Sequence, residues 1–380
     1  MYMKQTAVLV SIYAPIDGFP PTINLINEFS HREFEVYAIE VAKKKFKHSK
    51  VNFKEIKSLN FNKNLPKFIS NYFLFFIFLL AHLKIGRNQK IKNFVVFDCY
   101  SLLSIFILKK LRLISKESKV WYHNHDIGFS DDFKIFSLGW LVHKVEPVII
   151  KSVDFFTLPS KERSSHFKTR ACDFVLPNYP SVKIYDEYQS SFINKKISLI
   201  FQGRISSGHG FESIIKLLNL KINGYSLELV LKGMITGSYK EKLLSGLSPE
   251  VLKKIMFIGY TDYEDLPIIT SSSHIGIAIH QPRSLMHATL GTASNKIYEY
   301  IACGLPIIYL DNDHFNYYLD KYKWSFPVLD SHGPILNAIE KIINNYDSFS
   351  KEAKNSFTNE LNYEVYFDKA FAIYNPNYNE

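Results

Sequence analysis

The sequence predicts an α/β protein with two Rossmann-like, doubly wound domains. Short apolar runs alternate with helical patterns along the first half of the chain, which is typical of a parallel sheet covered by helices. A polar, proline-containing stretch at residues 177–196 interrupts this alternation, which then starts again. The length of 380 residues also exceeds the usual size of one domain. We therefore expect two domains joined near residue 180.

Each half contains the apolar runs and amphipathic segments that such a domain needs. In the first half, strands are expected at residues 7–13, 35–39, 94–97, 119–123 and 155–158, and helices at 22–29, 101–111 and 144–152. In the second half, strands are expected at residues 198–202, 227–232, 256–258, 275–279 and 306–309, and helices at 211–218, 239–244, 264–271 and 295–303. The tail at 359–374 is also helical in pattern.

The composition favours a globular protein of a reducing cytoplasm. Apolar residues make up 47% of the chain and charged residues 22%. Three cysteines are too few and too scattered for a disulfide framework or a zinc site. The first apolar run is short and is closed by Pro15, so it indicates a buried strand rather than a secretory signal.

The positive charge is concentrated in the first half of the chain. Residues 1–180 contain 27 basic and 15 acidic residues, a balance of +12, whereas residues 181–380 have a balance of −2. Such an excess favours anionic partners. The clusters Lys43-Lys44-Lys45-Lys47 and Lys109-Lys110-Arg112 lack nucleic-acid motifs. We therefore expect contact with a membrane or a lipid pyrophosphate rather than with nucleic acid, while a solvated basic face remains the alternative.

One apolar run, residues 72–81, could lie on a membrane surface. It is about half the roughly 20 residues that a spanning helix needs, so no segment is expected to cross a bilayer. A buried helix is the slightly favoured interpretation. A surface-bound helix is the other, because cations flank the run on both sides; these are Lys63, Lys67, Lys84, Arg87, Lys90 and Lys92.

Residues 291–310 carry the strongest signal for a ligand pocket. Ser294 is a candidate N-cap, and Gly304 followed by Pro306 ends the predicted helix. Apolar side chains point to the core from one face, while Asn295, Lys296 and Glu299 share the opposite face. A carboxylate there could accept hydrogen bonds from ribose hydroxyls. A plain amphipathic helix with a solvated Lys/Glu pair would show the same pattern.

A second signal follows the first strand of the second domain. Gly203 and Arg204 close that strand, and Gly208, His209 and Gly210 open the next helix. Glycines at this position let backbone amides approach a phosphate, and an arginine can bind two diphosphate oxygens. Lys232, at the end of a neighbouring strand, could add a second cation. A tight turn with an exposed arginine is the simpler alternative.

In this order, the motifs resemble the retaining GT-B glycosyltransferases, in particular glycosyltransferase family 4, over nearly the whole chain. The segment SNKIYEYIACGLPII resembles the family's nucleotide-sugar helix, and FQGRISSGHGF resembles its diphosphate loop. The resemblance implies that Glu299 binds the ribose and Arg204 the diphosphate. It also implies that Gly18, in the first loop, lies near the acceptor and the donor phosphate.

Two positions depart from the family pattern. The phosphate loop has His209 where the family usually has lysine, and Lys232 could compensate for the lost charge. The first glutamate of the paired-glutamate motif corresponds to Gly291. The group that contacts the donor sugar is therefore unassigned at that position.

The first domain supplies the expected catalytic histidines. The strand at 119–123 runs into Asn124-His125-Asp126, which resembles the family's His-Asp element beneath the transferred sugar. His125, with His123 second, is our candidate for supporting the developing oxocarbenium ion. No metal site is expected: Asp131-Asp132 is interpreted as a helix cap, and Asp311-Asn312-Asp313 as a loop after a strand.

The resemblance implies two domains facing a central cleft, at residues 1–180 for the acceptor and 181–358 for the donor, with a helix at 359–380 crossing back to the first. It further implies a cytoplasmic enzyme on the inner face of the plasma membrane. Such an enzyme would transfer a sugar from a nucleotide sugar, UDP-sugar first, to a lipid-linked or saccharide acceptor in surface polysaccharide synthesis, without a cofactor. An inverting transferase, a sugar-nucleotide epimerase and a non-catalytic binding subunit are the alternatives.

Overall fold

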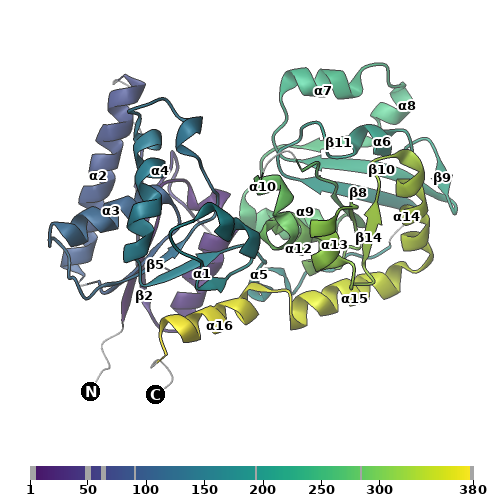
Figure 1. Cartoon of the computed structure of the whole chain (residues 1–380). Helices are drawn as coiled ribbons and strands as arrows, with labels where there is room; N and C mark the ends of the chain where they lie inside the picture. The colour runs from purple at the N-terminus through teal and green to yellow at the C-terminus, as the bar shows by residue number, and fades with distance from the viewer. Residues whose placement is uncertain are drawn as a thin grey trace. The chain divides into compact units, whose positions relative to one another are not determined.

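The chain folds into two compact units, seen in a computed structural model that describes residues 6–47, 53–60, 66–89, 91–192, 195–282 and 285–376. The first unit contains residues 1–177 and 366–380, and the second contains residues 178–365. Each unit has a parallel sheet with helices on both faces (Figure 1). This confirms the prediction of two Rossmann-like α/β domains.

The sheet of the first unit has seven parallel strands in the order β3-β2-β1-β4-β5-β6-β7. The strand order changes direction between β1 and β4, and loops at the carboxyl ends of such a pair form the usual ligand crevice. The strands are β1 (Ala7–Ile12), β2 (Glu35–Val41), β3 (Glu55–Leu59), β4 (Asn93–Val96), β5 (Lys119–His123), β6 (Phe155–Leu158) and β7 (Phe174–Val175).

Helices α1 (Pro20–His31) and α16 (Tyr363–Tyr374) pack together by their aromatic side chains. Phe29 of α1 meets Phe367 and Phe371 of α16 edge to face, and Trp121 of β5 stacks on Phe367. Helix α16 is thus part of the core of the first unit. Three other helices pack against one another: α2 (Lys67–Asn88), α3 (Cys99–Lys110) and α4 (Leu138–Ile149).

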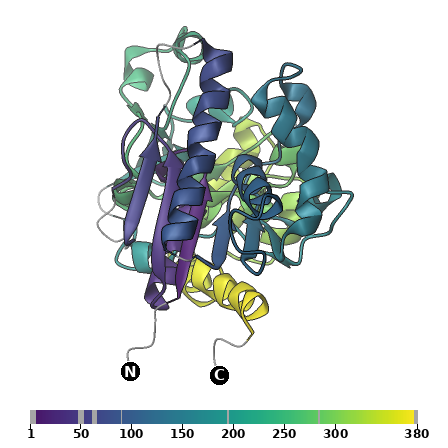
Figure 2. The same ribbon diagram turned by 90° about the vertical axis from the view of Figure 1, so that its left-hand side faces the viewer.

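Helix α2 is longer than the sequence indicated. Its 22 residues lie alongside the strands of β2 and β3 (Figure 2). It is the one helix among the described residues that is long and apolar enough to cross a membrane, and a third of its most apolar window is buried. The expectation that no segment has sufficient length was therefore wrong. The helix extends beyond residues 72–81 because Lys67, Lys84 and Arg87 are good helix formers and further apolar residues lie on both sides of that run.

The sheet of the second unit has the order β11-β10-β8-β12-β13-β14, with the short strand β9 (Lys221–Ile222) antiparallel to β10. The strand order changes direction between β8 and β12. The strands are β8 (Lys196–Gln202), β10 (Tyr225–Lys232), β11 (Ile255–Ile258), β12 (Ile275–Ala278), β13 (Ile307–Leu310) and β14 (Ser325–Val328).

The helices of the second unit follow the strands in the usual alternation. They are α5 (Val182–Tyr185), α6 (Phe211–Ile215), α7 (Gly237–Leu244), α8 (Pro249–Leu252), α9 (Leu266–Ser271), α10 (Leu285–Ala288), α11 (Leu290–Ala293), α12 (Asn295–Ala302), α13 (Asp313–Leu319), α14 (His332–Asn344) and α15 (Tyr346–Asn359). Leu199, Ile277 and Ile339 lie in the apolar core between the sheet and these helices.

Candidate active site

The loops after β8 and β10 run against each other at the carboxyl edge of the second sheet. The amide of Gly203 donates to the carbonyl of Lys232 over 2.9 Å. Gly203 and Gly233 have φ angles of +122° and +131°, and a Cβ on Gly233 would overlap with the carbonyl oxygen of Gly203. Both positions therefore require glycine. Arg204 is exposed beside them and makes no hydrogen bond to any residue that the structure describes.

Helix α12 buries its carboxylate rather than exposing it. Ile297 and Tyr300 point into the core as predicted, and Gly304 ends the helix with a φ of +72°. The side chain of Glu299 is nevertheless only 4% exposed. A solvated Lys/Glu pair is therefore excluded. Ser294 is the N-cap residue of α12, as predicted, but its side chain makes no capping hydrogen bond.

Two acceptors at the start of α12 have no partner. The Ser294 hydroxyl and the Asn295 amide oxygen are both buried without a hydrogen bond within the described residues. Nearby, Asn178 donates its backbone and side-chain amides to the carbonyls of Thr292 and Ala293. The start of the second unit thus holds the backbone just before α12, while two polar groups of the helix stay available to a ligand.

Lys296 directs its ammonium group towards the β8 loop. Its Nζ lies 3.1 Å from His280 Nε2 and 4.4 Å from the centre of the Phe201 ring. A Cβ on Gly203 would be 3.3 Å from the same Nζ. The Lys296 ammonium group of α12 therefore lies where β8 and β12 separate.

The charges of this site are set mainly by burial. Burial raises the pKa of Glu299 to about 7, although Lys232 and Lys296 act in the opposite direction. Burial lowers the pKa of Lys296 to about 7, against the effect of Glu299. A buried site of this kind favours an anionic ligand, because the negative charge of the ligand stabilises the charged form of the lysines.

His280, which lies two residues beyond β12, was not among the predicted site residues. Burial, and then the positive charges of Lys296 and His209, lower the pKa of His280 well below its usual value. The neutral ring accepts from Lys296 through Nε2, so Nδ1 carries the proton and is buried without a partner among the described residues. It can donate to a ligand oxygen. The role of His280 is apparent only from its contact with Lys296, sixteen positions away in the chain, and no local sequence motif indicates such a contact.

Both ring nitrogens of His209 contact other groups of the protein. Its Nδ1 donates to the carbonyl of Ile279 over 3.1 Å, and its Nε2 lies 3.2 Å from the Ser206 hydroxyl. Gly210, which follows, has a φ of +74° and precedes α6. The histidine therefore shapes the loop, while Lys296 supplies the cation that a lysine at this position would have given.

Gly291 leaves no room for a carboxylate side chain. Its amide donates to His314 Nε2 over 2.8 Å, and its carbonyl accepts from the hydroxyl of Tyr298. A Cβ at this position would overlap with Tyr318. The departure from the paired-glutamate pattern is thus built into the packing of α11 against α13.

In the first unit, His123 and His125 lie at the end of β5 as two buried, neutral imidazoles. His123 Nδ1 is 2.8 Å from the Thr157 hydroxyl, while its Nε2 is buried without a partner in the described chain. Burial, and then Arg163, lower the pKa of His123 to about 3. Burial, then His123, lower the pKa of His125 well below its usual value. Neither ring is charged near neutral pH.

His125 is held rigidly. Its ring stacks on Phe97 at 4.7 Å and on Phe19 at 5.3 Å, and its Nε2 is 3.1 Å from the Thr22 hydroxyl. Its backbone carbonyl accepts from Arg163 over 2.6 Å. A positioned neutral imidazole of this kind can support a developing positive charge.

The remaining predicted positions lie in loops and turns. Gly18 ends a short 3-10 turn, Ile16–Gly18, and is exposed in the loop after β1. Asn312 caps α13 through its side chain, as a loop after a strand would. Asp131 and Asp132 lie inside the turn Ser130–Asp132 and cap no helix, so that interpretation was wrong; Ser137 caps α4 instead.

Comparison with known proteins shows which family and which solved structures the chain resembles. Residues 186–358 match the family model described as glycosyl transferases group 1. No curated protein gives a significant match. Among solved structures, sucrose-phosphate synthase from Thermosynechococcus elongatus is 13% identical with a TM-score of 0.67, covering 98% of this chain and 99% of that one.

Two further structures share the fold. HepE of Anabaena, in complex with UDP and glucose, is 11% identical with a TM-score of 0.66, covering 96% of this chain and 98% of that one. WaaG, a glycosyltransferase involved in lipopolysaccharide biosynthesis, is 11% identical with a TM-score of 0.61, covering 96% and 99%. The protein has the GT-B fold of these glycosyltransferase structures, and the family match supports a glycosyltransferase. The residues that match the family model, 186–358, lie within the second unit.

Proposed function

We propose that the enzyme transfers a sugar from a UDP-sugar donor to a lipid-linked or saccharide acceptor, with retention of configuration, as in glycosyltransferase family 4. The observation that carries the proposal is the pair of Glu299 and Lys296, one turn apart on α12 and buried where β8 and β12 separate. A carboxylate there suits ribose hydroxyls, and a cation beside it suits a diphosphate.

The other donor contacts follow from the same edge of the sheet. Arg204 is exposed and available for phosphate oxygens, and Lys232 ends the adjacent strand. The Nδ1–H of His280 offers one more donor. Together they would stabilise the negative charge that develops on the leaving diphosphate. In the first unit, His125 would support the positive charge on the sugar, with His123 as the second candidate.

Replacement of Glu299 by glutamine tests the donor site. The substitution keeps the size of the side chain and removes the charge that would accept from the ribose. We expect the affinity for UDP, measured by titration calorimetry, to fall about 10-fold to 100-fold. The exposed Glu241→Gln on α7 is the matched control and should bind as the wild type does. Equal affinity in Glu299→Gln would refute the site.

The stereochemistry needs its own measurement. The anomeric configuration of the early product, followed by NMR with each accepted UDP-sugar, should equal that of the donor. Inversion would leave the donor site intact but exclude the proposed mechanism, and the class of accepted acceptor would be read from the same reactions.

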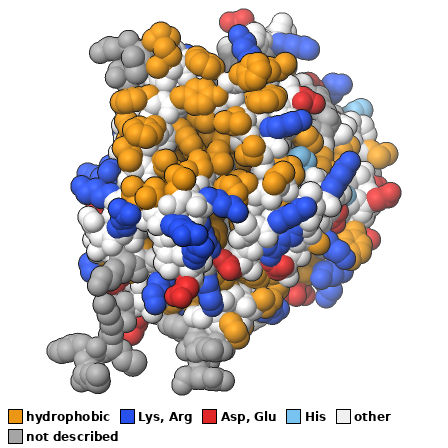
Figure 3. Space-filling model, turned by 60° about the vertical axis from the view of Figure 1, so that its left-hand side comes forward, with side chains coloured by type: hydrophobic (Ala, Val, Ile, Leu, Met, Phe, Trp, Pro, Cys, Tyr) orange, Lys and Arg blue, Asp and Glu red, His pale blue; other side chains and the backbone are white. Residues whose placement is uncertain are grey.

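We further propose that the first unit binds the cytoplasmic face of an anionic membrane. One side of this unit shows a large apolar area bordered by basic side chains (Figure 3). Helix α2 contributes exposed Phe68, Ile69, Phe73, Phe76 and Leu80. The exposed Ile135 and Phe136 adjoin them, because the Tyr72 hydroxyl donates to the carbonyl of Phe136 over 2.6 Å. Exposed aromatic side chains in this number favour an interface rather than water.

The basic border provides the charge complementarity. Arg87, in the last turn of α2, donates to the carbonyl of Leu113 just beyond α3. That end of α3 bears a pocket of about 370 Å³ lined by Lys109, Lys110, Arg112 and Lys116. Basic side chains near an anionic surface contribute roughly 1 kcal/mol each. The arrangement suits an acceptor carried on a lipid in surface polysaccharide synthesis.

Vesicle flotation tests this surface. The enzyme should float with phosphatidylglycerol vesicles and not with phosphatidylcholine vesicles, and the double variant Phe73→Glu/Phe76→Glu should lose most of that binding. Ile268→Glu, at an exposed apolar position of the second unit, is the control. Unchanged flotation of the double variant would remove α2 as the contact.

A further inference from the structure

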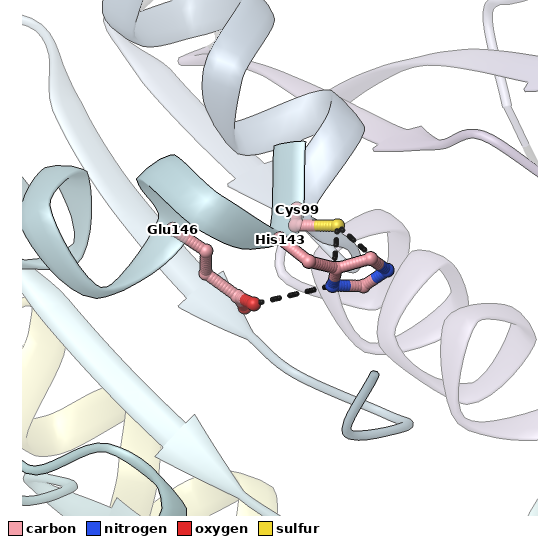
Figure 4. Close-up of side chains that lie close together, drawn as sticks. All are labelled: Cys99, His143 and Glu146. Carbon is pink, nitrogen blue, oxygen red and sulfur yellow. Dashed lines mark hydrogen bonds and ion pairs between the residues drawn. The ribbon is translucent and has the colours of Figure 1, made fainter. Parts of the chain in front are cut away.

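Three potential metal ligands meet in the first unit. Cys99 is the first residue of α3, after the capping residue Asp98. His143 and Glu146 lie three positions apart on α4, so they share one face of that helix. Figure 4 shows the three side chains converging from the two helices.

The distances fit a tetrahedral ion. Cys99 Sγ lies 3.5 Å from His143 Nδ1, and the same nitrogen lies 3.6 Å from Glu146 Oε2. All three ligand atoms are within 4.8 Å of one another. A zinc ion with bonds of about 2.3 Å to sulfur and about 2.0 Å to nitrogen separates those atoms by about 3.5 Å. The two separations from His143 Nδ1 therefore match tetrahedral zinc, and the third is at most 4.8 Å, so rotation of the Cys99 or Glu146 side chain would complete the site.

The surroundings favour a cation. The side chains of Glu146 and Cys99 are 1% and 3% exposed. Neutral donors serve one carboxylate oxygen of Glu146: the Tyr122 hydroxyl, and Asn124 Nδ2 over 3.0 Å. The other oxygen faces His143. A divalent ion would balance one carboxylate and one thiolate within this buried place, where an unbalanced charge is costly.

We propose that Cys99, His143 and Glu146 bind one Zn²⁺ ion, with water as the fourth ligand. Mixed sulfur, nitrogen and oxygen ligands suit zinc, whereas magnesium and calcium prefer oxygen alone. On binding, a zinc–sulfur bond forms, the bond between sulfur and hydrogen breaks, and the proton leaves to solvent.

The ion would hold the loop that carries a candidate catalytic residue. Asn124, which donates to Glu146, stands between His123 and His125 in the chain. A Cβ on Gly128 would overlap with the ring of His143, so this loop packs directly on the ligand. The Phe133 ring stacks on the His143 ring, with 5.0 Å between the two ring centres. The role proposed for the ion is to fix α3, α4 and this loop together.

Zinc titration of the full-length, tag-free protein tests the site. In competition with a chromogenic chelator, the wild type should bind one equivalent of zinc. Cys99→Ser, which preserves size, should weaken binding by more than about 100-fold, and Tyr122→Phe should weaken it about 10-fold by releasing a ligand. Cys172→Ser is the matched control: this half-buried cysteine is outside the cluster and should bind as the wild type does.

Cobalt provides a readout that a structural role alone would not change. Co²⁺ added to the metal-free wild type and to Cys172→Ser should give a thiolate-to-cobalt charge-transfer band, which Cys99→Ser should lack. Circular dichroism verifies folding, and His143→Gln replaces Cys99→Ser if the latter is unfolded. A wild type that binds no zinc, or a Cys99→Ser variant that binds it equally, would reduce the cluster to a hydrogen-bonded Cys–His pair.

Discussion

At the scale of single residues, the proposed donor site has its cation on a different element from the one that the family pattern indicates. His209 stands where a lysine was expected, and both its nitrogens contact the protein. Lys296 brings its ammonium group to Gly203 from helix α12 instead. The sequence placed Lys296 on the correct face, but its contact with His280 depends on the packing of two loops. Such a contact has no signal in local spacing.

This replacement predicts a pH-dependent donor affinity. Burial lowers the pKa of Lys296 to about 7, so its charged fraction falls as the pH rises through neutrality. Because a diphosphate binds the charged form better, UDP should bind more weakly at about pH 8 than at about pH 6. Lys296→Met should bind more weakly at the lower pH and vary less, although Glu299, His280, His209 and Lys232 also face the site.

Calorimetric titration of UDP at several pH values measures this effect. Lys253→Met, at an exposed lysine of the same unit, should keep the slope of the wild type. A slope in Lys296→Met as steep as that of the wild type would show that another group titrates.

At the scale of elements, apolar runs predicted the central strands and the edge strand β11 but missed the edge strands β3, β7 and β14. The strand at 119–123 and the strand at 155–158 have the expected bounds, since each is flanked by clear breaks. β3 (EIKSL) and β14 (SFPV) were not expected, because a half-polar run and a proline are weak strand signals. Neighbouring strands complete them: β3 pairs with β2, and β14 with β13.

At the same scale, the close contact between the loops after β8 and β10 predicts the effect of a substitution at Gly233. Gly233→Ala forces a Cβ onto the carbonyl of Gly203 at a φ of +131°. We expect a loss of about 2 kcal/mol in the free energy of unfolding of the second unit, with weaker UDP binding because the Gly203 loop must move. Denaturant titration measures the first effect and calorimetry the second.

A glycine in a permissive place is the control. Gly237 opens α7, has no atom near the position of a Cβ, and should tolerate alanine with unchanged or slightly higher stability. If both variants were equally stable, the close approach of the two loops would not be a constraint on the fold.

At the scale of the whole molecule, the last helix belongs to the first unit. Residues 366–380 group with residues 1–177, and Arg32 of the first unit pairs with both Glu28 and Asp368. The resemblance implied a helix that returns to the first domain. What the sequence left open is which side chains it uses, because the aromatic contacts with Phe29 and Trp121 join distant parts of the chain.

Phe367→Ala should therefore destabilise the first unit selectively. Phe367 is fully buried, and removal of such a ring costs about 3–5 kcal/mol. Hydrogen exchange should rise in β1, β4 and β5 and stay unchanged in the second unit. Lys369→Ala, two residues away and exposed, is the control. Exchange that rises equally in both units would mean that they unfold together.

The chain crosses between the two units twice, near residues 177 and 365. During synthesis, the ribosome completes all seven strands of the first sheet before it reaches the second unit, yet Phe367 and Phe371 emerge only after the second unit has been made. The nascent first unit must therefore wait, with Phe29 and Trp121 uncovered, while the whole second unit is made. Synthesis of the residues after 365, rather than completion of the first 177 residues, allows that core to close.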